Sequence, residues 1–73
     1  MKALEIEHLE QATRHVAEAE RRIAEQRLRV AELERDGHDA GQARSLLRLF
    51  EQTYSLMVEH RRMILRHLRQ SSN

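Results

Sequence analysis

Apolar side chains recur every three or four residues along almost the whole chain, which is the period of an α-helix. Residues 3–36 follow heptads in which Leu9 occupies an a position, and from Leu9 onward Gln26 is the one polar interruption of the inward-facing positions. The a positions are Leu9, Val16, Ile23 and Val30, and the d positions are Ala12, Ala19, Gln26 and Leu33. This pattern predicts a long helix with a coiled-coil seam, in which small alanines let a second helix approach closely.

Residues 40–70 keep the same period and predict a second long helix. Its apolar row is spaced alternately four and three residues apart, and Val58 and Leu65 widen it on one flank. The row consists of Ala43, Leu47, Phe50, Tyr54, Met57, Arg61, Ile64 and Leu68.

The pattern breaks at residues 37–39, where a turn is expected. Gly37 follows the last periodic residue, at the position where a left-handed helix cap favours glycine. Asp39 precedes Gln42 by three residues, which is the spacing of a capping box with Asp39 as the N-cap. The alternative is an Asp–His pair with His38 for metal or proton chemistry. No third group nearby would orient such a pair, so the turn interpretation is favoured.

A short connection between two helices makes them antiparallel neighbours, so we expect a single all-α hairpin with a frayed tail at 71–73. Folding the chain at the turn brings Glu34 to Arg44 and Arg27 to Glu51, both pairs of opposite charge. The same fold brings an acidic beginning beside a basic end. These groups are Glu5, Glu7 and Glu10 on one side, and Arg61, Arg62, Arg66 and Arg69 on the other.

The second helix carries more apolar surface than one neighbour covers. A further series, called the second row, lies beside its first row, on the flank away from Val58 and Leu65. The second row consists of Leu46, Leu49, Thr53, Leu56, His60, Met63 and His67. Large apolar side chains left at heptad spacing indicate an interface. We expect a homodimer that forms a four-helix bundle around Leu56, and the alternative is a groove for a helix of another protein.

Composition supports association and restricts the setting. A chain of 73 residues without cysteine and with only two aromatic side chains has a thin core, and domains of this size often need a partner. Charged residues make up 34% of the chain, yet the formal net charge is only +1. No apolar run approaches the length of a membrane span, and the first residues are unlike a signal peptide. A cytoplasmic location without membrane contact is expected.

Four of the five histidines fall in facing pairs, His8 with His67 and His15 with His60. The pairs lie about 10 Å apart along the helices, so each would need further ligands to hold a metal ion. Nearby arginines oppose a cation. We therefore predict no metal and no cofactor. Between metal-binding and merely exposed histidines lies a third hypothesis, a dimer that weakens when histidines in its interface are protonated. Because no catalytic constellation or glycine-rich phosphate loop is present, we expect no enzyme activity.

Nucleic-acid binding is the alternative to a protein-interaction module. Residues 59–73 contain four arginines and one glutamate, a net charge of +3. The candidate contacts are Arg61, Arg62, Arg66 and Arg69. Residues 1–10 carry a net charge of −2 and are expected to pack beside this end, which neutralises much of the positive field. Because nucleic-acid binders usually present an uncancelled basic surface, a scaffold or regulatory adaptor is favoured.

Residues 15–53 carry three elements that are shared with a known group of proteins. They are H-x-A-E-x-E-R-x-I at 15–23, L-E-R-D-G-H-D at 33–39, and A-x-x-L-L-x-x-F-E at 43–51. In these elements the chain resembles small helical-hairpin proteins of rhizobia and related alphaproteobacteria. The resemblance implies a bacterial origin and the same hairpin. That group has no assigned activity, so the resemblance carries over no functional residues.

Overall fold

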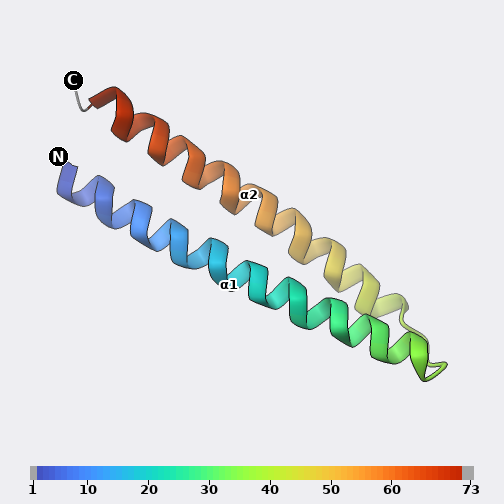
Figure 1. Ribbon diagram of the computed structural model, residues 1–73. Helices are drawn as coiled ribbons and strands as arrows, with labels where there is room; N and C mark the ends of the chain where they lie inside the picture. The colour runs from blue at the N-terminus through green and yellow to red at the C-terminus, as the bar shows by residue number, and fades with distance from the viewer. Residues whose placement is uncertain (1, 72–73) are drawn as a thin grey trace.

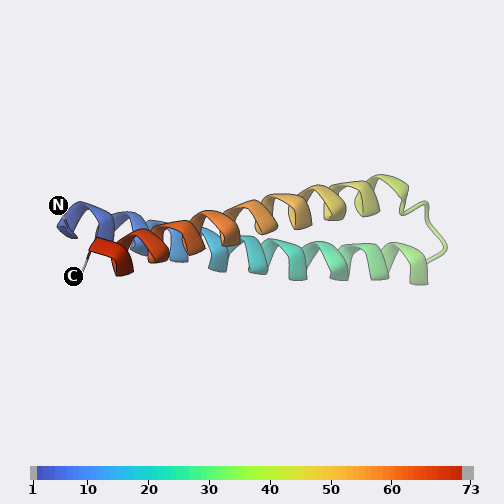
Figure 2. The same ribbon diagram turned by 90° about the horizontal axis from the view of Figure 1, so that it is seen from above.

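The protein is a hairpin of two long α-helices. The computed structural model describes residues 2–71, with α1 spanning Lys2–Arg35 and α2 spanning Gly41–Ser71. The helices pack side by side and antiparallel, so both chain ends lie at the same end of a rod 58 Å long (Figure 1, Figure 2). The expected all-α hairpin is therefore confirmed. Of the expected frayed tail, residue 71 is still helical, and residues 72–73 lie outside the described part of the chain.

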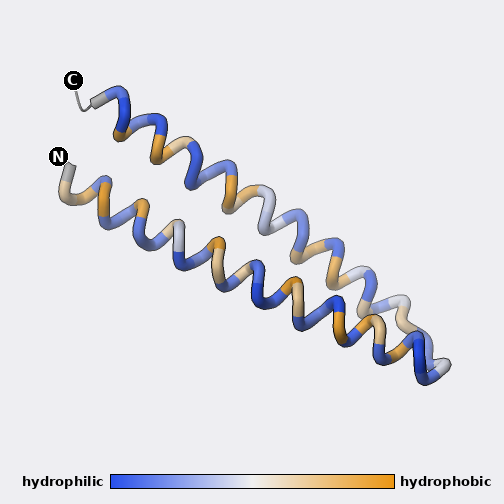
Figure 3. The backbone as a smooth tube through the Cα atoms, viewed as in Figure 1, coloured by the Kyte–Doolittle hydropathy of each residue, from blue (hydrophilic) through white to orange (hydrophobic). Residues whose placement is uncertain are grey.

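The core is a single line of small and β-branched side chains between the helices. On α1 the buried residues are the a and d positions Ala12, Ala19, Ile23 and Val30. The first row of α2 is only half-buried against them. Hydrophobic bands recur along both helices and alternate with hydrophilic ones (Figure 3). One helix packed on one other helix leaves both partly in water, so the buried core stays thin.

Gln26, the polar interruption of the α1 seam, has a partner across the hairpin. Its side-chain nitrogen donates a hydrogen bond of 3.0 Å to the backbone carbonyl of Ala43 in the first turns of α2. A half-buried amide that bonds to the facing backbone fixes the longitudinal position of the two helices. The interruption therefore sets the register near the turn.

The turn follows the pattern that ends many helices. Gly37 has a φ of 73°, the left-handed region in which glycine is favoured. The His38 amide donates to the Leu33 carbonyl at 2.9 Å, and the Gly37 amide donates to the Glu34 carbonyl at 3.2 Å. These two bonds make a Schellman motif, which satisfies carbonyls that the end of α1 would leave without partners.

Asp39 caps the beginning of α2. Its carboxylate accepts a hydrogen bond of 2.9 Å from the Gly41 amide, and the Ala40 carbonyl accepts the first helical bond, from the Arg44 amide. A Cβ on Gly41 would stand 3.1 Å from the Asp39 carboxylate, so the glycine leaves room for the cap. Within residues 2–71, no reciprocal bond runs from Gln42 to the Asp39 amide. The cap therefore forms without the full capping box.

Two ion pairs on one flank confirm the expected register. Arg27 pairs with Glu51 at 3.2 Å, and Arg44 pairs with Glu34 one heptad nearer the turn. All four side chains are substantially exposed, and exposed pairs contribute only about 0–1 kcal/mol each. Their role is to favour one alignment of the helices over its neighbours.

Replacing Gly37 tests the turn. We expect Gly37→Ala to lower the free energy of unfolding by about 1–2 kcal/mol, because alanine pays a steric cost in the left-handed region. Gly37→Asn is the matched control and should lose less, since asparagine tolerates this region better. Urea unfolding followed by circular dichroism at equal protein concentrations measures both. Equal stabilities of Gly37→Ala and the unaltered chain would contradict the role assigned to the turn.

Candidate interaction surface

The second row of α2 lies in water along its whole length. Leu49, Leu56 and Met63 stand seven residues apart and expose 55%, 72% and 57% of their surface. Leu46 is also exposed, and so are the three polar members of the row, Thr53, His60 and His67. Seven residues are close to two helical turns, so the three large side chains project from one side of the helix. They form an apolar stripe that α1 leaves uncovered.

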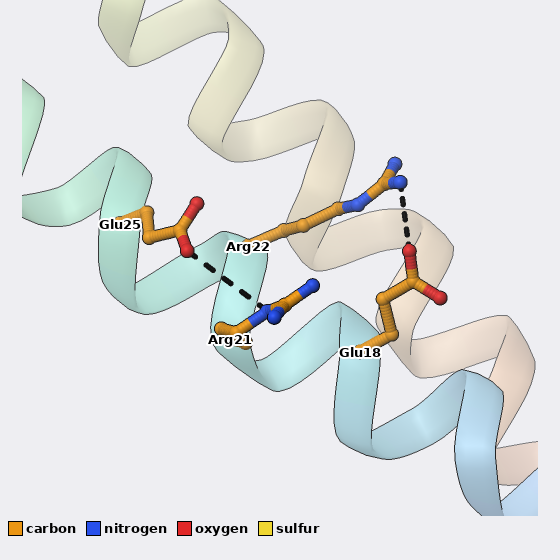
Figure 4. A network of polar contacts seen from close by, with 4 residues as sticks. All are labelled: Glu18, Arg21, Arg22 and Glu25. Atoms are coloured by element: carbon orange, nitrogen blue, oxygen red, sulfur yellow. Dashed lines mark hydrogen bonds and ion pairs between the residues drawn. The ribbon is translucent and has the colours of Figure 1, made fainter.

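The flank of α1 beside this stripe is charged. Glu18 and Arg22 form an ion pair of 2.8 Å there, and Arg21 and Glu25 form a second pair of 3.9 Å farther round the helix (Figure 4). These pairs link residues one turn apart in a single helix, which keeps their charges solvated. The apolar contact surface on this side therefore belongs to α2.

Three other large apolar side chains are exposed that the heptad analysis did not single out. Leu4 and Ile6 lie near the beginning of α1, and Leu28 exposes 63% of its surface in the middle of that helix. Leu28 occupies an f position, opposite the seam, and the heptad numbering already indicated its exposure. Isolated apolar side chains are normal on protein surfaces, so Leu28 differs from the second row in having no neighbours of its kind at heptad spacing.

At the open end of the hairpin, a hollow of about 430 Å³ is called the histidine groove. Its lining includes His8, His60 and His67 together with Met63 and Glu5. The Nε2 atom of His67 lies 3.1 Å from the Oε1 atom of Glu5, which links the two helices. His8 and His67, which were expected to approach each other, line the same hollow, and Glu5 lines it too.

Glu5 is a largely buried polar group whose hydrogen-bonding capacity is only partly satisfied. It occupies a d position, only 23% of its side chain is exposed, and its Oε2 atom is buried without a hydrogen-bond partner. A buried polar atom without a partner costs about 1–3 kcal/mol. Extending the heptads one turn back from Leu9 would have placed Glu5 in the seam, so the sequence held the signal for this residue.

The other histidine pair, His15 and His60, lines a smaller hollow with Leu56 and Thr53. Within residues 2–71, no three histidine, aspartate or glutamate side chains gather closely enough to hold a metal ion. His38 and Asp39 border a shallow hollow at the turn, and the Asp39 carboxylate serves as the helix cap. The histidines therefore define edges of apolar surface.

Two arginines near the end of α2, Arg61 and Arg62, take partners other than the acidic groups at the beginning of α1. Arg61 donates from Nε to the Thr13 hydroxyl at 2.8 Å, and Arg62 pairs at 2.8 Å with Glu59 of its own helix. The Glu5 carboxylate instead lies 3.1 Å from the His67 ring across the hairpin. Long arginine side chains can reach several nearby acceptors, and heptad spacing alone does not determine which acceptor each one binds.

These arginines border a hollow of about 730 Å³, called the basic groove, between the two helices. It lies on a different flank of α2 from the second row. Its floor is apolar, and its rim carries four arginines and one glutamate. The lining includes Val16, Ala17, Tyr54, Val58 and Leu65 in the floor, and Arg61, Arg62, Arg66, Arg69 and Glu20 at the rim. The sequence shows Val58 and Leu65 as a flank of the first row, but not the groove that both helices form around them.

Comparisons of this chain with protein-family models, with curated proteins and with solved structures give no match. Neither helix, over the described residues, is long and apolar enough to cross a membrane. The assignment of function therefore rests on the surfaces of the hairpin itself.

Replacing Glu5 tests the buried carboxylate. We expect Glu5→Leu to raise the free energy of unfolding by about 1–3 kcal/mol, because leucine suits a d position and removes the buried oxygen that has no partner. Glu7→Leu, the same change at an exposed f position, should alter stability by less than about 0.5 kcal/mol. Thermal unfolding of both variants at one pH and one concentration makes the comparison. A Glu5→Leu chain no more stable than Glu7→Leu would show that Glu5 carries no such cost.

Proposed function

We propose that this chain is a non-enzymatic protein-interaction module, a small scaffold or adaptor, which acts as a homodimer through the second row of α2. One observation carries the proposal: Leu49, Leu56 and Met63 are all more than half exposed and stand in line. The three positions extend over about 21 Å of helix. Covering such a stripe removes apolar surface from water, which favours association by about 25 cal/mol for each Å².

A second copy of the same helix fits this stripe. In an antiparallel pair with Leu56 at the two-fold axis, Leu49 of one protomer meets Met63 of the other, so each large side chain finds an apolar partner. The residues four positions before Leu49, Leu56 and Met63 are Ser45, Gln52 and Glu59, and Glu59 would face the uncharged Thr53 of the second copy. Two copies therefore meet along α2 without opposing like charges at the centre of the contact.

The charged flank of α1 indicates how two hairpins would be arranged. Because Glu18 and Arg22 keep their charges in water beside the second row, the two α2 helices form the centre of the contact and the α1 helices lie outside. This arrangement is a four-helix assembly held mainly by the α2–α2 interface. A helix of another protein could occupy the same stripe, and a monomeric chain in solution would favour that alternative.

Nucleic-acid binding through Arg61, Arg62, Arg66 and Arg69 has weaker support. Arg61 and Arg62 already engage Thr13 and Glu59, and the floor between the arginines is apolar. Binding to a phosphate backbone depends on cations that replace counterions along the nucleic acid. An apolar floor adds nothing to such a contact.

Replacing Leu56, the central apolar residue of the second row, with a charged residue tests the dimer. We expect Leu56→Glu to raise the dimer dissociation constant at least about 100-fold, because both protomers lose a buried leucine worth about 1.5–3 kcal/mol and gain a facing carboxylate. Leu28→Glu is the matched control, the same change at a side chain that is 63% exposed outside the second row. Size-exclusion chromatography with light scattering measures the mass of each. Equal masses for the two variants would contradict the proposed interface.

Cross-linking tests the direction of the two helices. The chain has no cysteine, so an introduced thiol pairs only with another introduced thiol. A mixture of Leu49→Cys and Met63→Cys chains should form disulfide-linked heterodimers under mild oxidation, whereas each variant alone should cross-link far less. Efficient cross-linking of either variant with itself would indicate a parallel pair and would overturn the antiparallel arrangement.

A further inference from the structure

The flank of the hairpin that carries the interhelical ion pairs changes character halfway along its length. Near the turn, Arg44 pairs with Glu34 and Arg27 pairs with Glu51, one heptad apart. Continued by one heptad, the same register places Glu20 opposite Val58. One heptad farther, it places Thr13 opposite Leu65. The ion pairs that close this flank therefore give way to apolar positions, and the basic groove begins there.

The groove joins an apolar floor to a rim of one charge. Val16 and Ala17 of α1 and Val58 and Leu65 of α2 lie in the floor. Arg61 is held at the edge by its bond of 2.8 Å to the Thr13 hydroxyl, which in turn bonds to the Leu9 carbonyl of α1. Four arginines and Glu20 line this groove, and Glu59 pairs with Arg62 at 2.8 Å, so positive charge still exceeds negative charge and the local field favours a negatively charged partner.

We propose that the basic groove binds an acidic amphipathic helix of a partner protein. An apolar stripe on that helix would cover the floor, and its carboxylates would pair with Arg66 at the rim and compete with Glu59 for Arg62. The part of α2 that lines the groove runs from Tyr54 to Arg69, about 22 Å at 1.5 Å per residue, which matches a helix of about 15 residues. Charge complementarity selects this partner class over a basic or neutral helix.

This proposal names a partner chemistry for the interaction module, but it does not depend on the dimer. The basic groove and the second row lie on different flanks of α2, with Arg66 also bordering the histidine groove, and residues of one hairpin form the whole basic groove. A hairpin can therefore use one flank for a second copy and the other for an acidic helix. Loss of one function by a mutation away from Arg66 should leave the other intact.

The chain offers its own reporter for this groove. Tyr54 is the single tyrosine of the chain, which has no tryptophan. If the bound peptide contains no aromatic residue, the tyrosine emission of the complex comes from Tyr54 in the floor of the groove. The probe is a helical peptide of about 15 residues with leucine at its a and d positions and glutamate at its e and g positions. The control peptide carries lysine in place of each glutamate. We expect saturable binding and a change in Tyr54 emission with the glutamate peptide only.

Two pairs of variants locate the binding site. Arg62→Glu combined with Arg66→Glu should weaken the affinity for the acidic peptide by about tenfold or more, whereas Arg29→Glu combined with Arg48→Glu, the same change in charge outside the groove, should not. Ala17→Phe should fill the floor and abolish binding. Ala31→Phe places the same bulk on an exposed residue of α1 two heptads away and should leave binding unchanged. Circular dichroism of each variant verifies that the hairpin remains folded.

The opposite results would overturn the proposal. Equal binding of the two peptides, or full binding by the folded Ala17→Phe chain, would show that this groove is not a site for an acidic helix. A fluorescein-labelled single-stranded RNA that binds while the peptide does not would assign the arginines to nucleic acid instead. The Leu56→Glu chain should bind the acidic peptide as well as the unaltered chain does. Loss of binding in that variant would show that the groove is not complete within one hairpin.

Discussion

The structure depends on one geometric constraint: two helices meet along a single line, and each can cover only one row of its neighbour. α1 has one such row, in which alanines at d positions and β-branched residues at a positions bring α2 close. α2 has two rows, and pairing with α1 covers only the first. The second row, centred on Leu56, stays in water, and the cost of that exposure is the driving force for the association that we propose.

Polar groups decide how the helices align, while the apolar groups hold them together. The Gln26 side chain on the Ala43 carbonyl and the pair of Arg27 with Glu51 favour one register. The same register ends the ion pairs at Glu20 and opens the basic groove. Glu5 shows the opposite situation, because its place in the seam buries an oxygen atom that no partner satisfies. Polar contacts thus fix the register of the helices near the turn, whereas at the open end a buried polar atom lacks a hydrogen-bond partner.

Much of the fold follows from the sequence, because each helix repeats one period and Gly37 marks the only place where that period stops. Opposite charges at positions 27 and 51 predict the alignment of the two helices. The partners of the arginines did not follow in the same way. Arg61 binds a threonine and Arg62 binds a glutamate of its own helix, since long side chains reach several acceptors that heptad spacing does not rank. The basic groove escaped prediction because residues of both helices form it only after they align.

Sedimentation equilibrium of the unaltered chain over a wide range of concentrations tests the central claim most directly. One chain has a mass of 8.7 kDa. If the second row of α2 requires cover by a second copy, the fitted mass should rise to that of two chains as the concentration increases. A single species of one-chain mass at every concentration, from a fully helical and stable hairpin, would contradict the account.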